Sequence, residues 1–310
     1  MKENYYSFNS YLKKCFNTKV HKISLNAGFT CPNKDGTLSY EGCIFCNESG
    51  FSRFSAGGAS IEHQIETSFN FLKNRFGARK FIAYFQNATN TNASITELRN
   101  AYDVIKKYPE IVGLSIATRP DCIDEEKLGL IEGYASDYDV WIEYGVQTIH
   151  DRTLQSIKRS HRFSDSLQAI KATARRNIKV GIHVILGLPG ETYDDMMQTA
   201  HTLAYLPVSG IKFHVLHILK GTQLAHLYAE ERINLLSRTE YIELVCDFLE
   251  VIDPECVILR LISDANDKIL VAPSWINRKQ DIINAIKKEL EIRGSCQGGR
   301  YEEKKNMYIR

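Results

Sequence analysis

The sequence lacks any hydrophobic run long enough to cross a bilayer, and its start has no apolar core of the kind found in secretory signals. It also lacks a large charge imbalance, because 39 Lys and Arg residues against 37 Asp and Glu residues give a formal net charge of +2. A nucleic-acid-binding domain typically has a more basic balance with clustered cations. These absences predict a cytoplasmic protein with no membrane segment, in which any basic surface is local.

A disulfide framework is absent as well, because the eight cysteines do not form the dense series of a small secreted domain. Three of them lie close together, as Cys31, Cys43 and Cys46, and no fourth cysteine or second compact set accompanies them. The other five are scattered and are expected to be buried or incidental thiols: Cys15, Cys122, Cys246, Cys256 and Cys296.

The close trio is a candidate metal site with two interpretations. A structural zinc ion needs four ligands, so a zinc site would have to recruit Cys15, His21 or His63. An iron-sulfur cluster can be held by three thiolates, which leaves one iron open to a substrate or cofactor. Because the Cys-x-x-Cys spacing at 43–46 occurs in both kinds of site, the spacing alone leaves the two interpretations open.

Alternating strand-like and helix-like segments predict an α/β fold. Six β-rich segments, each followed by helix-like sequence, imply parallel strands with right-handed crossovers, in either a doubly wound sheet or a barrel. These segments are 20–26, 80–85, 111–117, 139–146, 179–187 and 210–218. Beyond residue 221 the pattern weakens to a helix near 238–252, a strand at 257–262 and a helix at 277–293. We therefore expect an N-terminal segment (1–19), a barrel (20–220) and a C-terminal α/β extension (221–310) packed on it.

Four motifs occur in series at the expected strand ends. They are the cysteine loop after the first strand, Ala117-Thr-Arg-Pro-Asp121, Glu143-Tyr-Gly-Val-Gln147 with the later Arg159-Ser160-His161, and Gly187-Leu-Pro-Gly-Glu-Thr192. Together they resemble the radical S-adenosylmethionine (SAM) superfamily, in particular a compact bacterial family close to the elongator catalytic subunit but without its acetyltransferase domain. Ser160 departs from that family, which usually has Gly there. The resemblance implies a partial (β/α)6 TIM-type barrel of the radical SAM type.

The resemblance also implies cofactors. A 4Fe-4S cluster would be held by Cys31, Cys43 and Cys46, and S-adenosyl-L-methionine would bind the open iron and yield a radical that abstracts a substrate hydrogen. Phe45 would lie beside the adenine. Other candidate SAM contacts are Gln86, Asn87, Glu143, Gln147 and Gly187, although Glu143 and Gln147 could instead belong to a hydrogen-bond network of the barrel core.

Substrate-binding or catalytic candidates lie further along the strands: Arg119, His183, Lys212, His214 and Arg260. Strand alternation predicts that Lys212 and His214 share one face, but whether it is the inner or the outer face stays open. Arg119 and Arg260 have the donor fork that suits a carboxylate or phosphate, and both could instead be members of structural ion pairs.

The implied function is modification of tRNA at the carbon-five side chain of the wobble uridine, by trimming carboxymethylaminomethyl to aminomethyl. Local basic groups and the tail from Arg300 to Arg310 could track an RNA backbone. An electron donor such as flavodoxin or ferredoxin would be a second partner. Two alternatives stay open, namely radical chemistry on a small molecule or peptide, and a non-catalytic zinc-stabilised RNA-binding protein.

Overall fold

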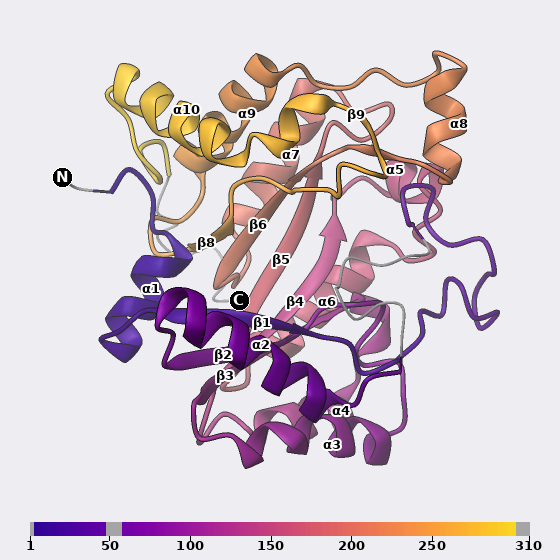
Figure 1. Ribbon diagram of the computed structural model, residues 1–310. Helices are drawn as coiled ribbons and strands as arrows, with labels where there is room; N and C mark the ends of the chain where they lie inside the picture. The colour runs from indigo at the N-terminus through magenta and orange to yellow at the C-terminus, as the bar shows by residue number, and fades with distance from the viewer. Residues whose placement is uncertain (1–2, 48–57, 302–310) are drawn as a thin grey trace, which may run out of the picture.

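A curved parallel sheet forms the centre of the computed structural model, which describes residues 3–47 and 58–301 (Figure 1). Its strand order is β1-β2-β3-β4-β5-β6-β8, and every neighbouring pair is parallel. The sheet curls into a partial barrel, as the resemblance implied. The strands are β1 (Val20–Leu25), β2 (Lys80–Phe85), β3 (Ile111–Thr118), β4 (Asp139–Gln147), β5 (Lys179–Leu186), β6 (Gly210–Val215) and β8 (Val257–Arg260).

Helices cover the outer face of this sheet (Figure 1). Between the strands lie α2 (Ile61–Phe76), α3 (Ile95–Asp103), η1 (Val104–Lys107), η2 (Pro120–Cys122), α4 (Glu125–Glu132), α5 (Asp151–Ser156), α6 (Phe163–Ala174) and α7 (Tyr193–Ala204). After β6 come α8 (Gln223–Ala229), α9 (Arg238–Val251), η3 (Ser274–Asn277) and α10 (Lys279–Ile292). The main hydrophobic core fills the space between helices and sheet.

Local sequence explains these elements. The central strands are buried on both faces, as in β4, where only Asp139 is partly exposed; such strands read as nearly continuous apolar runs. Helix starts are set by capping boxes, for example where the Ser94 side chain accepts from the Glu97 amide and the Glu97 carboxylate accepts from the Ser94 amide. The parallel β1-to-β6 series predicted from these patterns is confirmed.

The N-terminal segment closes the lower end of the barrel, where the strands begin. It contains α1 (Phe8–Phe16), whose Tyr11 and Phe8 rings meet the Trp141 indole edge-on at 5.5 and 5.9 Å. The Tyr6 carbonyl accepts a hydrogen bond of 2.8 Å from the amide of Ile258 in β8. The segment therefore packs on both the floor and the edge of the sheet.

The C-terminal region differs from the expectation in two places. Its strand does not stand apart on an extension but pairs with β6 as the seventh strand of the sheet, so the parallel sheet has one strand more than the predicted six. The predicted strand 210–218 is split: β6 ends at Val215, and β7 (Ile218–Leu219) pairs antiparallel with β9 (Leu270–Ala272). The chain leaves the sheet after Val215, because Ile218 pairs with Ala272 of β9 instead of with a strand of the sheet.

No helix in the described part of the chain is long and apolar enough to cross a membrane.

Candidate functional site

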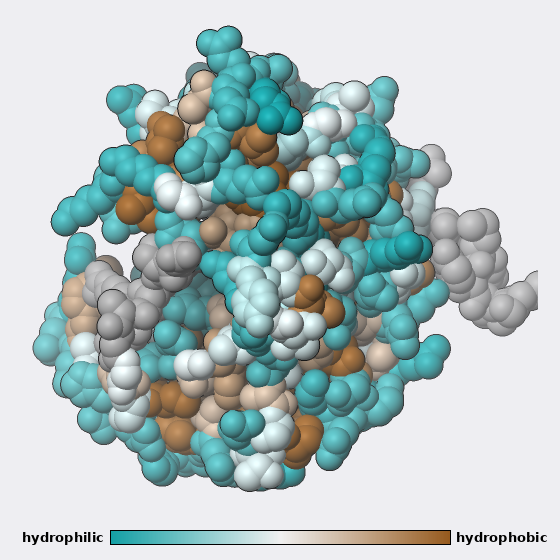
Figure 2. Space-filling model, turned by 90° about the vertical axis from the view of Figure 1, so that its right-hand side faces the viewer, coloured by the Kyte–Doolittle hydropathy of each residue, from teal (hydrophilic) through white to brown (hydrophobic). Residues whose placement is uncertain are grey.

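The cysteine trio lies on a long loop that leaves the carboxyl end of β1, at the rim where the strands of the barrel end (Figure 1). Cys43 is buried, whereas Cys31 and Cys46 are half-buried. The loop turns at each end of the trio: the Lys34 amide donates to the Cys31 carbonyl at 2.7 Å, and the Cys46 amide donates to the Cys43 carbonyl at 2.9 Å. The loop face of the molecule is mostly hydrophilic, with small, separate hydrophobic areas (Figure 2).

The three thiols are electrostatic neighbours. Burial raises the pKa of Cys46, the positive charge of Lys34 opposes that rise, and Cys43 and Cys31 add to it. Cys31 also adds to the rise in the pKa of Cys122, whose main cause is burial. Cys31 and Cys43 therefore lie close enough to Cys46 for their charges to affect its pKa.

Side-chain donors surround the sulfur of Cys43. The Asn33 amide nitrogen lies 3.5 Å and the Arg159 guanidinium 3.6 Å from Cys43 Sγ. Asn33 also donates to the Lys158 carbonyl at 2.7 Å, and Ser160 Oγ donates to Asn33 Oδ1. These contacts tie the cysteine loop to residues 158–160 and place a guanidinium beside the sulfur of Cys43.

Ser160 adopts a left-handed backbone conformation with φ of 61°. This conformation is one that Gly accepts at little cost, which explains the Gly usual in the related motif. Here the hydrogen bond from Ser160 Oγ to Asn33 Oδ1 offsets the conformational cost of a side chain at this position. Ser160 therefore keeps the left-handed backbone conformation that Gly would adopt.

Two groups at the rim keep unpaired polar atoms. Arg119 is 2% exposed and donates from Nε and Nη2 to the Asp121 carboxylate at 2.9 and 2.7 Å, but its Nη1 has no partner among the described residues. Gln147 ends β4 with φ of 70°, and its buried Oε1 is likewise unpaired within the described ranges. Buried polar atoms normally find partners, so these atoms suit a polar ligand in the barrel mouth. Arg119 is also a member of an ion pair, one of its two predicted roles.

Of the other predicted SAM contacts, Gln86, Asn87 and Gly187 lie at strand ends, whereas Phe45 lies on the cysteine loop. Phe45 is half-buried and packs against the cluster around Ile44 and Leu188. Gln86 accepts from Ser24 Oγ at 3.4 Å, and Asn87 follows it directly after β2. Gly187, with φ of 83°, follows β5 and approaches Leu236 so closely that a Cβ atom would lie 3.0 Å from its Cγ.

Glu143 lies inside the barrel, 1% exposed, and accepts five hydrogen bonds. Its Oε1 accepts from Lys22 at 2.9 Å and Ser115 at 2.8 Å, and its Oε2 accepts from Tyr84 at 2.9 Å, His183 at 2.7 Å and Lys212 at 3.0 Å. These donors come from β1, β3, β2, β5 and β6. The Glu143 carboxylate thus connects its own strand β4 to five others. These are the contacts of a hydrogen-bond network in the barrel core.

Each strand of the sheet contributes a polar side chain to this layer, with Arg260 from β8 as the seventh member. In the parallel pairing His183 lies opposite Lys212, and Lys212 opposite Arg260, so the three side chains share the inner face. The His183 and His214 rings lie 5.4 Å apart. The face of Lys212 and His214, which the sequence left open, is therefore the inner one.

Burial and charge shift the pKa values of this layer. Burial would raise the pKa of Glu143, but Lys212, Lys22 and His183 outweigh it and hold that pKa well below its usual range. Burial lowers the pKa of Lys212 to about 7, Glu143 opposes this, and Arg260 and Lys22 add to it. Burial and the Lys212 charge lower the pKa of His183 to about 4, so His183 is neutral and donates from Nε2 to the carboxylate.

Sequence reasoning missed three members of the layer, Lys22, Tyr84 and Ser115, and two residues beside Cys43, Asn33 and Arg159. The only available signal for the first three was a polar or phenolic residue within an apolar strand. Arg159 was part of a recognised motif, but no role was attached to it. Asn33 gave no signal, because its contacts depend on how the loop folds.

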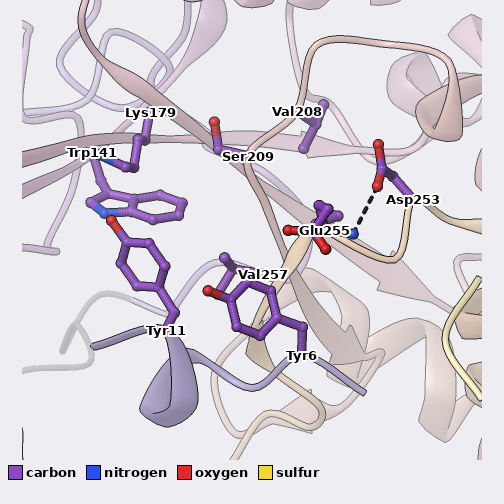
Figure 3. Close-up of a pocket in the computed structure, with 10 residues that line it drawn as sticks. Tyr6, Tyr11, Trp141, Lys179, Val208, Ser209, Asp253, Glu255 and Val257 are labelled. Atoms are coloured by element: carbon purple, nitrogen blue, oxygen red, sulfur yellow. Dashed lines mark hydrogen bonds between the residues drawn. The ribbon is translucent and has the colours of Figure 1, made fainter. Parts of the chain in front are cut away.

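A surface cavity of about 360 Å³ lies at the opposite end of the barrel, beside the N-terminal segment (Figure 3). Trp141, Tyr11 and Tyr6 form one side of it, and Lys179 reaches its edge. Lys179 is paired there with Asp139 at 2.8 Å. The cavity lies at the strand starts, away from the cysteine loop, so it is separate from the candidate site.

The residues present fit the implied cofactors. Cys31 and Cys43 lie within electrostatic range of Cys46, Lys34 and Arg159 supply positive charge to balance an anionic cluster, and Arg119 and Gln147 offer unpaired buried atoms. Within residues 3–47 and 58–301, no three or more His, Cys, Asp or Glu side chains are grouped as ligands of a metal ion. A four-iron cluster distributes its thiolates over separate irons, whereas the ligands of one ion meet at a single centre.

Comparison with known proteins gives two family matches. Residues 31–203 match the profile described as Radical SAM superfamily, and residues 208–292 match the profile described as Radical_SAM C-terminal domain. The chain is 39% identical to the uncharacterized protein YtqA of Bacillus subtilis over 300 residues, which are 96% of this chain and 92% of that protein.

Two more distant matches are one in sequence and one in structure. The chain is 23% identical, over 211 residues, to a tRNA uridine(34) acetyltransferase of Dehalococcoides mccartyi, covering 67% of this chain and 43% of that protein. Among solved structures, the archaeal Elp3 of Methanocaldococcus infernus superposes with a TM-score of 0.64 at 17% identity, covering 89% of this chain and 64% of that one. The second likeness confirms the fold.

Proposed function

This chain belongs to the radical SAM superfamily, and we propose that it modifies tRNA at the carbon-five side chain of the wobble uridine, trimming carboxymethylaminomethyl to aminomethyl. The cofactors of this family are a 4Fe-4S cluster and SAM. When bound, they would supply one-electron chemistry that removes a hydrogen atom from the carboxymethyl CH2. Return of one electron to the oxidised cluster would convert the resulting carbon radical to an imine, and water would hydrolyse the imine, so that the carboxymethyl group leaves as glyoxylate and the primary amine stays on the uridine. Family membership favours this enzyme over a zinc-stabilised binding module.

We assign the cluster to Cys31, Cys43 and Cys46. The support is their shared region, together with the donors that Asn33 and Arg159 direct at Cys43 Sγ. Hydrogen bonds to cluster sulfurs raise the reduction potential, so these two residues would make the site easier to reduce. Flavodoxin or ferredoxin would supply the electron.

We assign SAM to the polar rim beside these thiols. The unpaired buried atoms Gln147 Oε1 and Arg119 Nη1 could form hydrogen bonds with SAM, and Gln86 and Asn87 lie at the end of β2. Phe45 and Gly187 border the same rim. Glu143 is committed to five donors, so its part is to position the layer below rather than to hold SAM directly.

The tRNA substrate is supported by the similarity to a tRNA uridine(34) acetyltransferase over two thirds of this chain. The loop face in Figure 2 is hydrophilic, which suits a polar nucleic-acid partner. Most of the basic tail that we expected to follow an RNA backbone, residues 302–310, lies outside the described residues. The carboxylate of that side chain also matches the interior, where three basic residues, Lys22, Lys212 and Arg260, outnumber one acidic residue, Glu143.

We further propose that residues 20–220 carry the cofactors and that residues 221–310 complete the substrate side. Arg260 supports this division, because it comes from the later region yet lies opposite Lys212 on the inner face.

The test is nucleoside analysis of tRNA by mass spectrometry in a strain lacking this gene. The expected result is accumulation of carboxymethylaminomethyluridine and loss of the aminomethyl product. Complementation with the wild-type gene should restore the product, whereas a Cys43→Ala gene should not. A wobble-uridine profile that does not change on deletion refutes the proposal.

A further inference from the structure

We infer that Lys212, Arg260 and His214 form a carboxylate-binding subsite inside the barrel, distinct from the residues assigned to the cluster and the SAM rim. The inference rests on the proposed function in one respect, the identity of the molecule that supplies the carboxylate. It follows from the way β6 and β8 pair, from unused hydrogen-bond donors and from the charge of the layer.

A β-bulge directs Arg260 inward. Ile211 pairs with Ile258 and the next residue, Lys212, pairs with Arg260, so Leu259 is an extra residue in β8. Bulges of this kind turn the following side chain and occur often beside active sites. The result is that two basic side chains stand directly opposite each other on the inner face, an arrangement that an anion between them stabilises.

The donors of these residues are only partly used. A lysine has three donors, and Lys212 uses two, toward Tyr84 OH at 2.6 Å and Glu143 Oε2 at 3.0 Å. Among the described residues the Arg260 guanidinium forms no hydrogen bond and only a 3.7 Å ion pair with the half-exposed Asp264. His214 Nε2 is buried and has no partner within the described ranges.

Protein groups neutralise this charge only in part. Glu143, the one carboxylate in the layer, is occupied by its five donors, and the half-exposed Asp264 lies 3.7 Å from Arg260, whereas the layer holds three basic side chains, Lys22, Lys212 and Arg260. A planar carboxylate offers two oxygens that match an arginine fork and leave lone pairs for a lysine. Arg260 keeps 27% of its side chain exposed, so a ligand can reach it.

Two molecules of the proposed reaction carry a carboxylate: the carboxymethylaminomethyl side chain of the substrate and the methionine part of SAM. The same chemistry would recognise either. We test both by measuring binding to the reconstituted holoenzyme without a reductant, so that no turnover occurs.

The probes are two anticodon stem-loop RNAs with identical sequence, one carrying carboxymethylaminomethyluridine and one carrying aminomethyluridine at the wobble position. Because they differ only in the carboxymethyl group, the ratio of their dissociation constants reports on the carboxylate alone. We expect the wild-type enzyme to prefer the carboxylated RNA by about ten- to one-hundred-fold, the effect of a charged hydrogen-bond pair. SAM affinity is measured beside it by equilibrium dialysis.

Arg260→Gln should reduce the RNA ratio to near one if the substrate supplies the carboxylate. It should instead weaken SAM binding and leave the ratio unchanged if SAM supplies it. Arg260→Lys keeps the charge without the fork and should have an intermediate effect. The surface variant Arg75→Gln controls for general RNA affinity, and the cluster absorption spectrum confirms that each variant is folded.

The inference is overturned if Arg260→Gln and Lys212→Met change neither the RNA ratio nor SAM affinity. Failure of the proposed function is read separately, by adding reductant to the wild-type enzyme and looking for the aminomethyl product. A lowered SAM affinity in Arg260→Gln would uphold the subsite even if no tRNA were converted.

Discussion

Replacing Glu143 by Gln tests whether the interior network holds the barrel together. The substitution keeps the shape of the side chain but removes its charge, and it turns one acceptor oxygen into an NH2 donor. On one side that NH2 would face Lys22 and Ser115; on the other it would face Tyr84, His183 and Lys212. The first orientation is cheaper, because Lys22 is 24% exposed and can turn to water.

The remaining cost comes from Lys212, which is 6% exposed and loses its counter-charge. Removing one partner of a buried ion pair typically costs about 3–5 kcal/mol. We therefore expect Glu143→Gln to lower the free energy of unfolding by about 3 kcal/mol, the lower end of that range, since Lys212 can lose its proton near neutral pH. Adding Lys212→Met should recover part of the loss, with a coupling energy of about 1–3 kcal/mol.

The assay is urea unfolding of the holoprotein followed by tryptophan fluorescence, which reports on Trp141 in the barrel floor and on Trp275 in the C-terminal region. Glu110→Gln is the matched control: Glu110 also accepts from a lysine at 2.9 Å, but both partners are exposed by a third or more. Glu110→Gln should lower the free energy of unfolding by less than about 1 kcal/mol. The reasoning is refuted if Glu143→Gln costs no more than this control, or if the effects of Glu143→Gln and Lys212→Met simply add.

Three further changes have expected outcomes. Cys43→Ala should leave the purified protein without stoichiometric iron and sulfide and without SAM cleavage, whereas Cys296→Ala, at an exposed lone thiol, should keep both; cleavage by Cys43→Ala would contradict the ligand assignment. Ser160→Gly should be nearly neutral in thermal unfolding, whereas Ser160→Val should cost about 1–2 kcal/mol, because φ is 61° there; equal midpoints would show that the backbone is not constrained. The folded-state pKa of Lys212 is about 7 and its ordinary value is 10.5, so the unfolded chain binds more protons between those values and stability should rise with pH across that window. Lys212→Met should flatten that rise relative to the wild type, and identical pH profiles in urea unfolding would count against a buried, depressed Lys212.

The order of the strands was predictable because parallel strands buried on both faces are marked by continuous apolar sequence. The same signal failed after Val215. The run 210–218 is strand-like throughout, yet its last residue, Ile218, pairs with Ala272 of β9 instead of with β5. Likewise 257–260 reads as a strand but says nothing of its partner. Pairing depends on contacts distant in the chain, which a local pattern does not contain.

The candidate site divides in the same way. The cysteines and Gln147 were identifiable because they belong to motifs with fixed spacing. Lys212 and His214 were recognisable as sharing a face, since strand alternation fixes relative direction, but only the pairing with His183 showed that the face is the inner one. Arg260 was uncertain for a further reason, because the bulge at Leu259 breaks alternation within its own strand.

The layer inside the barrel links the two family matches. The cysteines and Gln147 fall within residues 31–203, whereas Lys212, His214 and Arg260 fall within residues 208–292. Glu143 lies in the first and binds Lys212 of the second at 3.0 Å. Because Arg260 comes from β8 and pairs with β6, we expect a change of its side chain to alter the inner basic face without disturbing the cysteine loop. We therefore expect related proteins that keep the cysteine trio but lack a basic residue at the Arg260 position to bind substrates without a carboxylate. Exchanging that one residue should shift the preference between the carboxymethylaminomethyl RNA and the aminomethyl RNA.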